Sequence, residues 1–233
     1  AFDEGDRIAI PTPGYPAYRN LMMGLGLTPV AVRAGAEQNW KLNLAEMDSW
    51  DELPDGLMIA SPSNPTGVVM DDSELAEICR WCDARGVRLI SDEIYHGLTY
   101  EGEEHSILEY TDQAFVLGGF SKAYAMTGWR IGYGAGPEQL IKAMSKLQSQ
   151  STSNPSSIAQ WAAVEALNGP QGFIDDNNKV FKERRDLVVS MLTRPRAFRA
   201  RRRRVPSTST RPARAASARP RPRATSSATT RTS

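Results

Sequence analysis

The fold of this 233-residue chain is decided by the stretch Leu57–Tyr95, which reads LMIASPSNPTGVVMDDSELAEICRWCDARGVRLISDEIY. Two short apolar runs, Leu57–Ala60 and Val87–Ser91, are typical of strands that are buried on both faces. Between them, an acidic capping sequence predicts a helix over Asp71–Arg85, with Gly86 as its stop signal. A strand, a helix and a second strand in this order predict a unit of parallel α/β structure.

The same alternation continues on both sides of this stretch. Further buried strands are predicted at Arg7–Ile10, Pro29–Val32, Ala114–Leu117 and Arg130–Tyr133. Further helices are predicted at Pro137–Leu147, Ser156–Leu167 and Gly172–Leu192. We therefore expect an α/β fold, a three-layer α/β/α sandwich with a mostly parallel sheet. In such sheets, ligands bind beyond the carboxyl ends of the strands.

Composition divides the chain near residue 194. Residues 1–193 contain 15 Lys and Arg against 27 Asp and Glu, whereas residues 194–233 contain 13 Arg and no acidic residue. The Arg, Ala, Pro, Ser and Thr of this tail lack the apolar area that ordering requires, so we expect disorder. The composition favours a frame-shifted segment over a nucleic-acid-binding arm in which Arg201–Arg204 would neutralise phosphates. Function is therefore sought before residue 194.

Several classes of protein are excluded by simple counts. No window approaches the roughly 18 consecutive apolar residues of a membrane-spanning helix. The first residues carry no export signal, and the two cysteines permit one disulfide at most, so we expect a cytoplasmic protein. Cys79 and Cys82 lie within a predicted helix, which favours packing over redox or metal chemistry. His96 and His105 are too few for a metal cluster, and no metal site is predicted.

Polar side chains collect where the predicted strands end. Asn64 follows the first strand of the deciding stretch between two prolines, and Asp92 and Tyr95 follow the second. Lys122 and Arg130 come after the strand Ala114–Leu117. Taken singly, these residues could be turn residues or surface charges. Together at one sheet edge they predict a site that pairs a cation, binds an oxyanion and holds a phosphate.

With these residues in this order, the chain resembles the class I/II aminotransferases of fold type I, which use pyridoxal 5′-phosphate (PLP). The resemblance covers about residues 1–193 and rests on motifs in a fixed order. These are Pro13-Gly14-Tyr15-Pro16, Asn64-Pro65-Thr66-Gly67, Asp92-Glu93-Ile94-Tyr95, Ser121-Lys122 and Thr127-Gly128-Trp129-Arg130. Gly119 departs from the many members that carry a serine three residues before the lysine, which puts one phosphate contact in doubt.

The resemblance implies a role for each candidate residue at the cofactor ring. Lys122 would be the Schiff-base lysine and the general acid/base. Asp92 would keep the pyridine nitrogen protonated, so that the ring accepts electrons. Tyr95 and Asn64 would hydrogen-bond the phenolic oxygen of the ring. Tyr15 would stack on the ring.

The phosphate of the cofactor would be held by Arg130, whose planar guanidinium suits it, with Ser121 as a hydroxyl donor. Family members also carry an arginine that grips the substrate α-carboxylate. No arginine of the tail lies in a matching motif, so that role is assigned to none of them. The identity of the substrate amino acid is therefore left open.

The implied function is transfer of an amino group between an α-amino acid and a 2-oxo acid by a ping-pong aldimine/ketimine mechanism. A related PLP lyase or synthase, or an inactive fragment, stays open as an alternative. The resemblance also implies a homodimer. We expect residues 1–170 to form an incomplete PLP-binding large domain, 171–193 to begin a long helix toward a small domain, and 194–233 to form the tail.

Overall fold

A computed structural model describes residues 1–193, in which six strands form one sheet. The strands are β1 (Arg7–Thr12), β2 (Thr28–Arg33), β3 (Gly56–Ala60), β4 (Arg88–Asp92), β5 (Phe115–Gly119) and β6 (Gly132–Ala135). Their spatial order is β2-β1-β3-β4-β5-β6. The first five strands are parallel, and β6 pairs with β5 in the antiparallel direction. The prediction of a mostly parallel sheet is confirmed.

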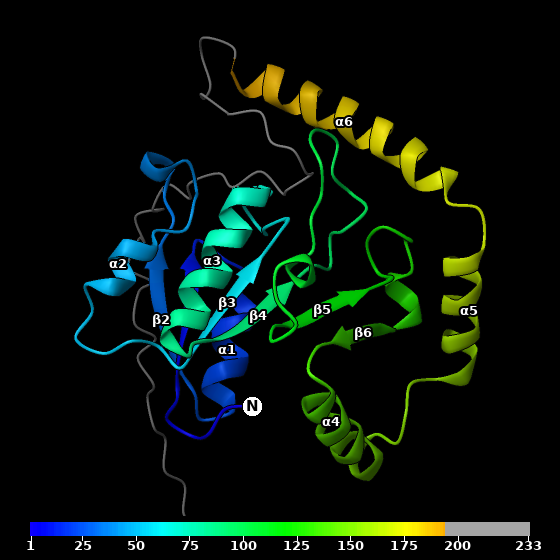
Figure 1. Cartoon of the computed structure of the whole chain (residues 1–233). Coiled ribbons are helices and arrows are strands. Elements are labelled where there is room, and N and C mark those ends of the chain that lie inside the picture. Colours follow the sequence, from blue (N-terminus) through cyan, green and yellow to red (C-terminus); the bar gives the residue numbers. More distant parts are fainter. Residues whose placement is uncertain (194–233) are drawn as a thin grey trace, which may run out of the picture.

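Residues 1–193 contain six helices, two of which pack on opposite faces of this sheet. The six helices are α1 (Pro16–Gly24), α2 (Leu44–Asp48), α3 (Asp72–Arg85), α4 (Glu138–Ser151), α5 (Ser157–Asn168) and α6 (Gly172–Leu192). Short 3-10 turns occur at Ala36–Gln38, Ile107–Glu109 and Thr127–Trp129. Figure 1 shows α5 and α6 as an arc around the β5–β6 end of the sheet, with α6 passing beside the loop that joins β4 to β5.

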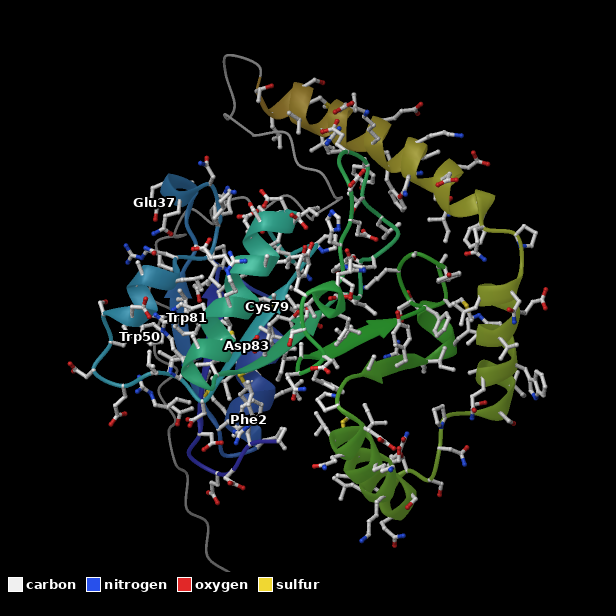
Figure 2. The ribbon with its side chains drawn as sticks, viewed as in Figure 1. Phe2, Glu37, Trp50, Cys79, Trp81 and Asp83 are labelled. Atoms are coloured by element: carbon white, nitrogen blue, oxygen red, sulfur yellow. The ribbon has the colours of Figure 1, made fainter. Side chains whose placement is uncertain are left out.

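The two faces of the sheet follow from the alternation of side chains along each strand. Leu57 and Ile59 of β3 pack with the buried residues of α3, whereas Met58 packs with Met22 of α1. Figure 2 shows Trp81 on α3, which lies in front of the sheet in this view. Trp81 belongs to the core cluster that contains Leu57 and Ile59, and Trp50 packs against this cluster. This arrangement gives the expected three layers, with α3 on one face and α1 on the other.

The predicted elements agree with the structure within a few residues, and α6 coincides with its predicted range. One boundary is wrong: the predicted strand Arg130–Tyr133 begins only at Gly132. Arg130 instead has φ 53°, in the left-handed region, and ends a 3-10 turn. Within residues 1–193, no helix has the length and apolar character needed to cross a membrane. The predicted tail, 194–233, lies outside the described residues.

The start of α3 shows why this helix begins where the sequence predicts. Asp71 accepts a hydrogen bond from the Glu74 amide at 3.0 Å, and the Glu74 carboxylate accepts one from the Asp71 amide at 3.0 Å. This reciprocal pair is a capping box. Hydrogen bonds from the Ser73 hydroxyl and the Glu74 amide lower the pKa of Asp71 to about 2.

The substitution Asp71→Ala should lower the free energy of unfolding by about 1 kcal/mol, because it removes the cap. Asp71→Asn, which keeps the acceptor oxygen, should lose less. Since the pKa of Asp71 is lowered in the folded state, the charged cap stabilises the fold above the ordinary carboxyl pKa, and its contribution is lost as the pH falls toward 2. Urea unfolding at neutral and acidic pH measures both effects, and equal stability of Asp71→Ala and the parent would contradict the assignment.

Candidate active site

Parallel register brings the ends of β3, β4 and β5 together. Ala60 at the end of β3 lies opposite Asp92 of β4, and Asp92 lies opposite Leu117 of β5. The Glu93 amide donates to the Leu117 carbonyl at 2.8 Å, which extends the pairing one residue beyond β4. The loops that carry Asn64 and Lys122 therefore leave the sheet on either side of Asp92.

Asp92 is held by donors on both of its oxygens. Its Oδ1 accepts from the Ile94 amide at 3.0 Å, and its Oδ2 accepts from the phenol of Tyr18 on α1. Burial, followed by the charge of Asp92 and its hydrogen bond, raises the pKa of Tyr18 far above the usual range. Tyr18 thus stays protonated and donates, and Asp92 presents a fixed carboxylate.

Tyr95 and Asn64 lie close to each other beside this carboxylate. The Asn64 Nδ2 group donates to the Tyr95 hydroxyl oxygen at 3.4 Å. Burial and the charge of Asp92 raise the pKa of Tyr95, while the Asn64 hydrogen bond opposes the shift. A neutral phenol and a neutral amide therefore lie side by side, where both can donate hydrogen bonds to one anionic oxygen of a ligand.

Lys122 reaches the same group of side chains from the other side. Its Nζ lies 5.5 Å from the centre of the Tyr95 ring. The side chain of Lys122 is otherwise exposed at the start of the turn after β5. The exposed amine of Lys122 is therefore accessible to a ligand that lies beside Tyr95 and Asn64.

Tyr15 borders the site from the loop before α1. Its ring meets that of Tyr18 edge-on, with centroids 5.4 Å apart and an interplanar angle of 81°. Tyr15 is 46% exposed, so part of its aromatic surface is accessible to a ligand. Tyr18 was not predicted as a site residue, although its spacing of three residues from Tyr15 in a helix start offers a signal for it.

Ser121 and Arg130 belong to one hydrogen-bonded turn. The Thr127 hydroxyl donates to the Ser121 carbonyl at 2.8 Å, and Arg130 Nη1 donates to the Thr127 carbonyl at 2.8 Å. Arg130 is exposed, and its left-handed backbone turns the chain back into β6. These bonds join Ser121 and Arg130 to the lysine-bearing turn, and the Arg130 guanidinium donates within that turn.

Glu93, next to Asp92 in sequence, has a different role because neighbouring side chains of an extended chain point to opposite faces. It is buried and accepts from the Ser91 hydroxyl at 3.0 Å, the Ser106 hydroxyl at 2.8 Å and the Ile107 amide at 2.9 Å. These donors satisfy the charge of Glu93 within the protein. Asp92 is therefore the carboxylate of this pair that faces the site.

The cysteine pair lies away from this site in the core under α3. Cys79 and Cys82 are buried, and burial raises their pKa values to about 11 and 12. Such thiols are poor nucleophiles and metal ligands at neutral pH. Over the described range 1–193, no three His, Cys, Asp or Glu side chains are grouped as a metal site would need.

Comparison with known proteins agrees with this geometry. The family described as Aminotransferase class I and II matches residues 1–204. The chain belongs to this family. It is 43% identical over 205 residues to a probable aspartate/prephenate aminotransferase of Rickettsia bellii, covering 85% of this chain and 51% of that protein. It is 44% identical over 195 residues to an aspartate/prephenate aminotransferase of Cereibacter sphaeroides, covering 81% and 49%.

Solved structures of class I and II aminotransferases share the fold. The aspartate aminotransferase from Thermus thermophilus, determined with maleate, superposes with a TM-score of 0.79 at 35% identity. The match covers 82% of this chain and 52% of that one. The chain therefore spans about half the length of the relatives that it matches.

The substitution Asp92→Asn should lower the pKa of Tyr18, because it removes the charge and weakens the hydrogen bond, two of the causes that raise this pKa. Burial persists, so the pKa of Tyr18 should stay above its ordinary value. Because the phenol stays protonated over the accessible pH range, the ¹³Cζ chemical shift of labelled tyrosines at neutral pH, which responds to the hydrogen bond of the phenol, measures the change by NMR. Asp72→Asn is a matched control, since Asp72 accepts from Tyr110 at 2.6 Å outside the site, and only Tyr110 should respond. An unmoved Tyr18 would contradict the Tyr18–Asp92 contact.

Proposed function

We propose that this aminotransferase-family chain carries the PLP-binding site of an enzyme that transfers an amino group between an α-amino acid and a 2-oxo acid. The observation that carries the proposal is the convergence of Asp92, Tyr95 and Lys122 at the carboxyl edge of the sheet, with Asn64 on Tyr95. Since the chain spans about half of its relatives, this activity is proposed for the protein that contains the whole site.

The residues fit the ring of PLP in both charge and donor type. The Asp92 carboxylate suits a protonated pyridine nitrogen, and its two bound donors keep it oriented. The Asn64 amide and the Tyr95 phenol suit the anionic phenolic oxygen. The exposed ring of Tyr15 suits the face of an aromatic cofactor. When bound, PLP supplies an electron sink for the bonds at the substrate Cα.

The phosphate would be held by the turn between β5 and β6. Arg130 offers a planar guanidinium with two parallel donors, and Ser121 offers a hydroxyl in the same hydrogen-bonded turn. Arg130 lies beyond the carboxyl end of β5. Parallel α/β sheets bind their ligands beyond the carboxyl ends of the strands. Phosphate binding would fix the position of the ring against Asp92.

Lys122 would act on the reacting atoms. Its Nζ would bind the cofactor covalently, be displaced by the substrate amine and then carry a proton from the substrate Cα. Tyr95, whose ring lies 5.5 Å from the Lys122 Nζ, and Asp92 would keep the ring of the cofactor in one orientation during both half-reactions. One amine then serves both as covalent anchor and as general acid/base.

The substrates are proposed at the level of class. Relatives named aspartate/prephenate aminotransferases support an amino acid and a 2-oxo acid as the reactants. We also propose a cytoplasmic homodimer, with a large domain over residues 1–170 and the start of a connecting helix over 171–193. A PLP lyase or synthase would use the same seven residues, and comparing the products formed from one amino acid separates it from a transaminase.

Incubation with PLP followed by borohydride reduction should place a phosphopyridoxyl group on Lys122 and not on the exposed Lys142. Peptide mapping by mass spectrometry detects it. Lys122→Ala should remove the adduct and slow amino transfer by at least ~100-fold, the scale of general acid/base catalysis. A folded chain that forms no adduct, or forms it on another lysine, would overturn the proposed site.

The substitution Arg130→Gln should weaken PLP binding by on the order of tenfold while leaving binding of pyridoxal, which lacks the phosphate, unchanged. Absorbance titration with each compound measures the two affinities. Arg80→Gln on the exposed face of α3 is the matched control and should alter neither. Equal losses for PLP and pyridoxal would show that Arg130 supports the fold of the site and does not bind phosphate.

A further inference from the structure

Helix α6 contacts both loops that carry the reactive side chains. We define the first loop as residues 95–101, which begins with Tyr95 after β4, and the lysine turn as residues 121–126, which contains Lys122 after β5. The strands that lead into these loops are joined up to the hydrogen bond from the Glu93 amide to the Leu117 carbonyl. Beyond that bond, the separation of Tyr95 and Lys122 depends on what packs against the two loops.

The first loop is bound to α6 by polar contacts. Asn178 Nδ2 donates to the Gly97 carbonyl at 2.7 Å. The Arg185 side chain, only 4% exposed, pairs with Glu101 at 2.9 Å and lies 5.6 Å from the centre of the Tyr100 ring. A buried guanidinium needs such partners, so this ion pair fixes where the loop meets the helix.

The lysine turn is bound to the same helix and to the residue before it. Phe181 of α6 packs against the apolar cluster that contains Ala123 of the turn and Leu98 of the first loop, and Tyr95 packs against the same cluster. The Tyr124 hydroxyl donates to Gln171 Oε1 at 3.1 Å, and the Tyr124 ring lies 6.0 Å from that of Phe173. The helix and the residue before it therefore contact the lysine turn and the first loop.

Gly97 marks the point where the three segments meet. A Cβ atom at this position would lie 3.0 Å from the Ala123 Cβ of the lysine turn and 3.7 Å from Ile174 of α6. Its φ of +89° also favours glycine. The first loop, the lysine turn and α6 are thus packed without space for one additional methyl group.

We infer that α6 is a brace for the active site, in which Phe181 and the Arg185–Glu101 pair are positioning residues that set the placement of Tyr95 relative to Lys122. The inference rests on the proposed function, because its consequence is the geometry offered to PLP. Phe181 acts through the apolar cluster to which both loops contribute, and Arg185 acts through Glu101 on the first loop.

The test uses two variants of the full chain and two matched controls. Phe181→Ala removes the side chain that packs against the shared cluster. Glu101→Gln removes the charge by which the first loop pairs with Arg185, while the Arg185–Asp186 pair within α6 is kept. Leu187→Ala truncates an apolar side chain of α6 that is 59% exposed, and Asp176→Asn removes the exposed Asp176–Lys179 pair on the same helix. Circular dichroism establishes that each variant is folded.

The first readout is amide hydrogen exchange without cofactor. Residues 95–101 and 121–126 should exchange faster in Phe181→Ala, and residues 95–101 in Glu101→Gln, with no change in either control. The second readout is PLP affinity by absorbance titration, which should fall on the order of tenfold in both test variants because small displacements of reactive groups are costly.

The outcomes separate this inference from the proposed function. Unchanged exchange and unchanged PLP affinity in folded test variants would overturn the brace. Faster exchange confined to the two loops, in a parent chain that forms no Lys122 adduct, would uphold the brace as a structural link and overturn the proposed function. Faster exchange throughout the sheet would also overturn the brace, since it would show a general loss of stability.

Discussion

The parallel register of β3, β4 and β5 is the constraint on which the site depends. Asp92 lies between Ala60 and Leu117, so the segments that follow these three strands leave the sheet side by side. The residues of the site are far apart in sequence, yet backbone hydrogen bonds determine where the segments that carry them leave the sheet. A slip of one residue in β4 would turn Asp92 toward α3 and bring Ser91 or Glu93 to the site.

The register also decides how charge is distributed. Glu93 points into the protein, where three donors bind it, whereas Asp92 keeps a carboxylate directed at the site. Burial keeps the phenols of Tyr18 and Tyr95 protonated. The site therefore combines one fixed negative charge with neutral donors and the amine of Lys122. This combination suits a ligand with a protonated nitrogen at one position and an anionic oxygen at another.

Local sequence patterns predict much of this arrangement, because buried strands, caps and motifs are short-range signals. Motif order predicts Asn64, Asp92, Tyr95 and Lys122 as site residues, and these four residues lie at one edge of the sheet. Other features depend on contacts between distant residues. The Tyr18–Asp92 bond joins residues 74 positions apart, and the Arg185–Glu101 bond joins residues 84 apart. Amphipathic periodicity predicts that α6 forms but does not identify its partners.

The net negative charge of residues 1–193 gives a further reason why the cationic side chains of the site have to be placed accurately. Residues 1–193 carry 27 acidic against 15 basic side chains, so their net field repels anions. A phosphorylated ligand would therefore have to be held by short-range contacts, with its phosphate at Arg130 and its reacting atoms at Lys122. Such contacts weaken steeply when a group is displaced, because hydrogen bonds depend on distance and angle. A negatively charged body thus makes accurate placement of these cations more important, and α6, which packs against the lysine turn, is the element placed to maintain it.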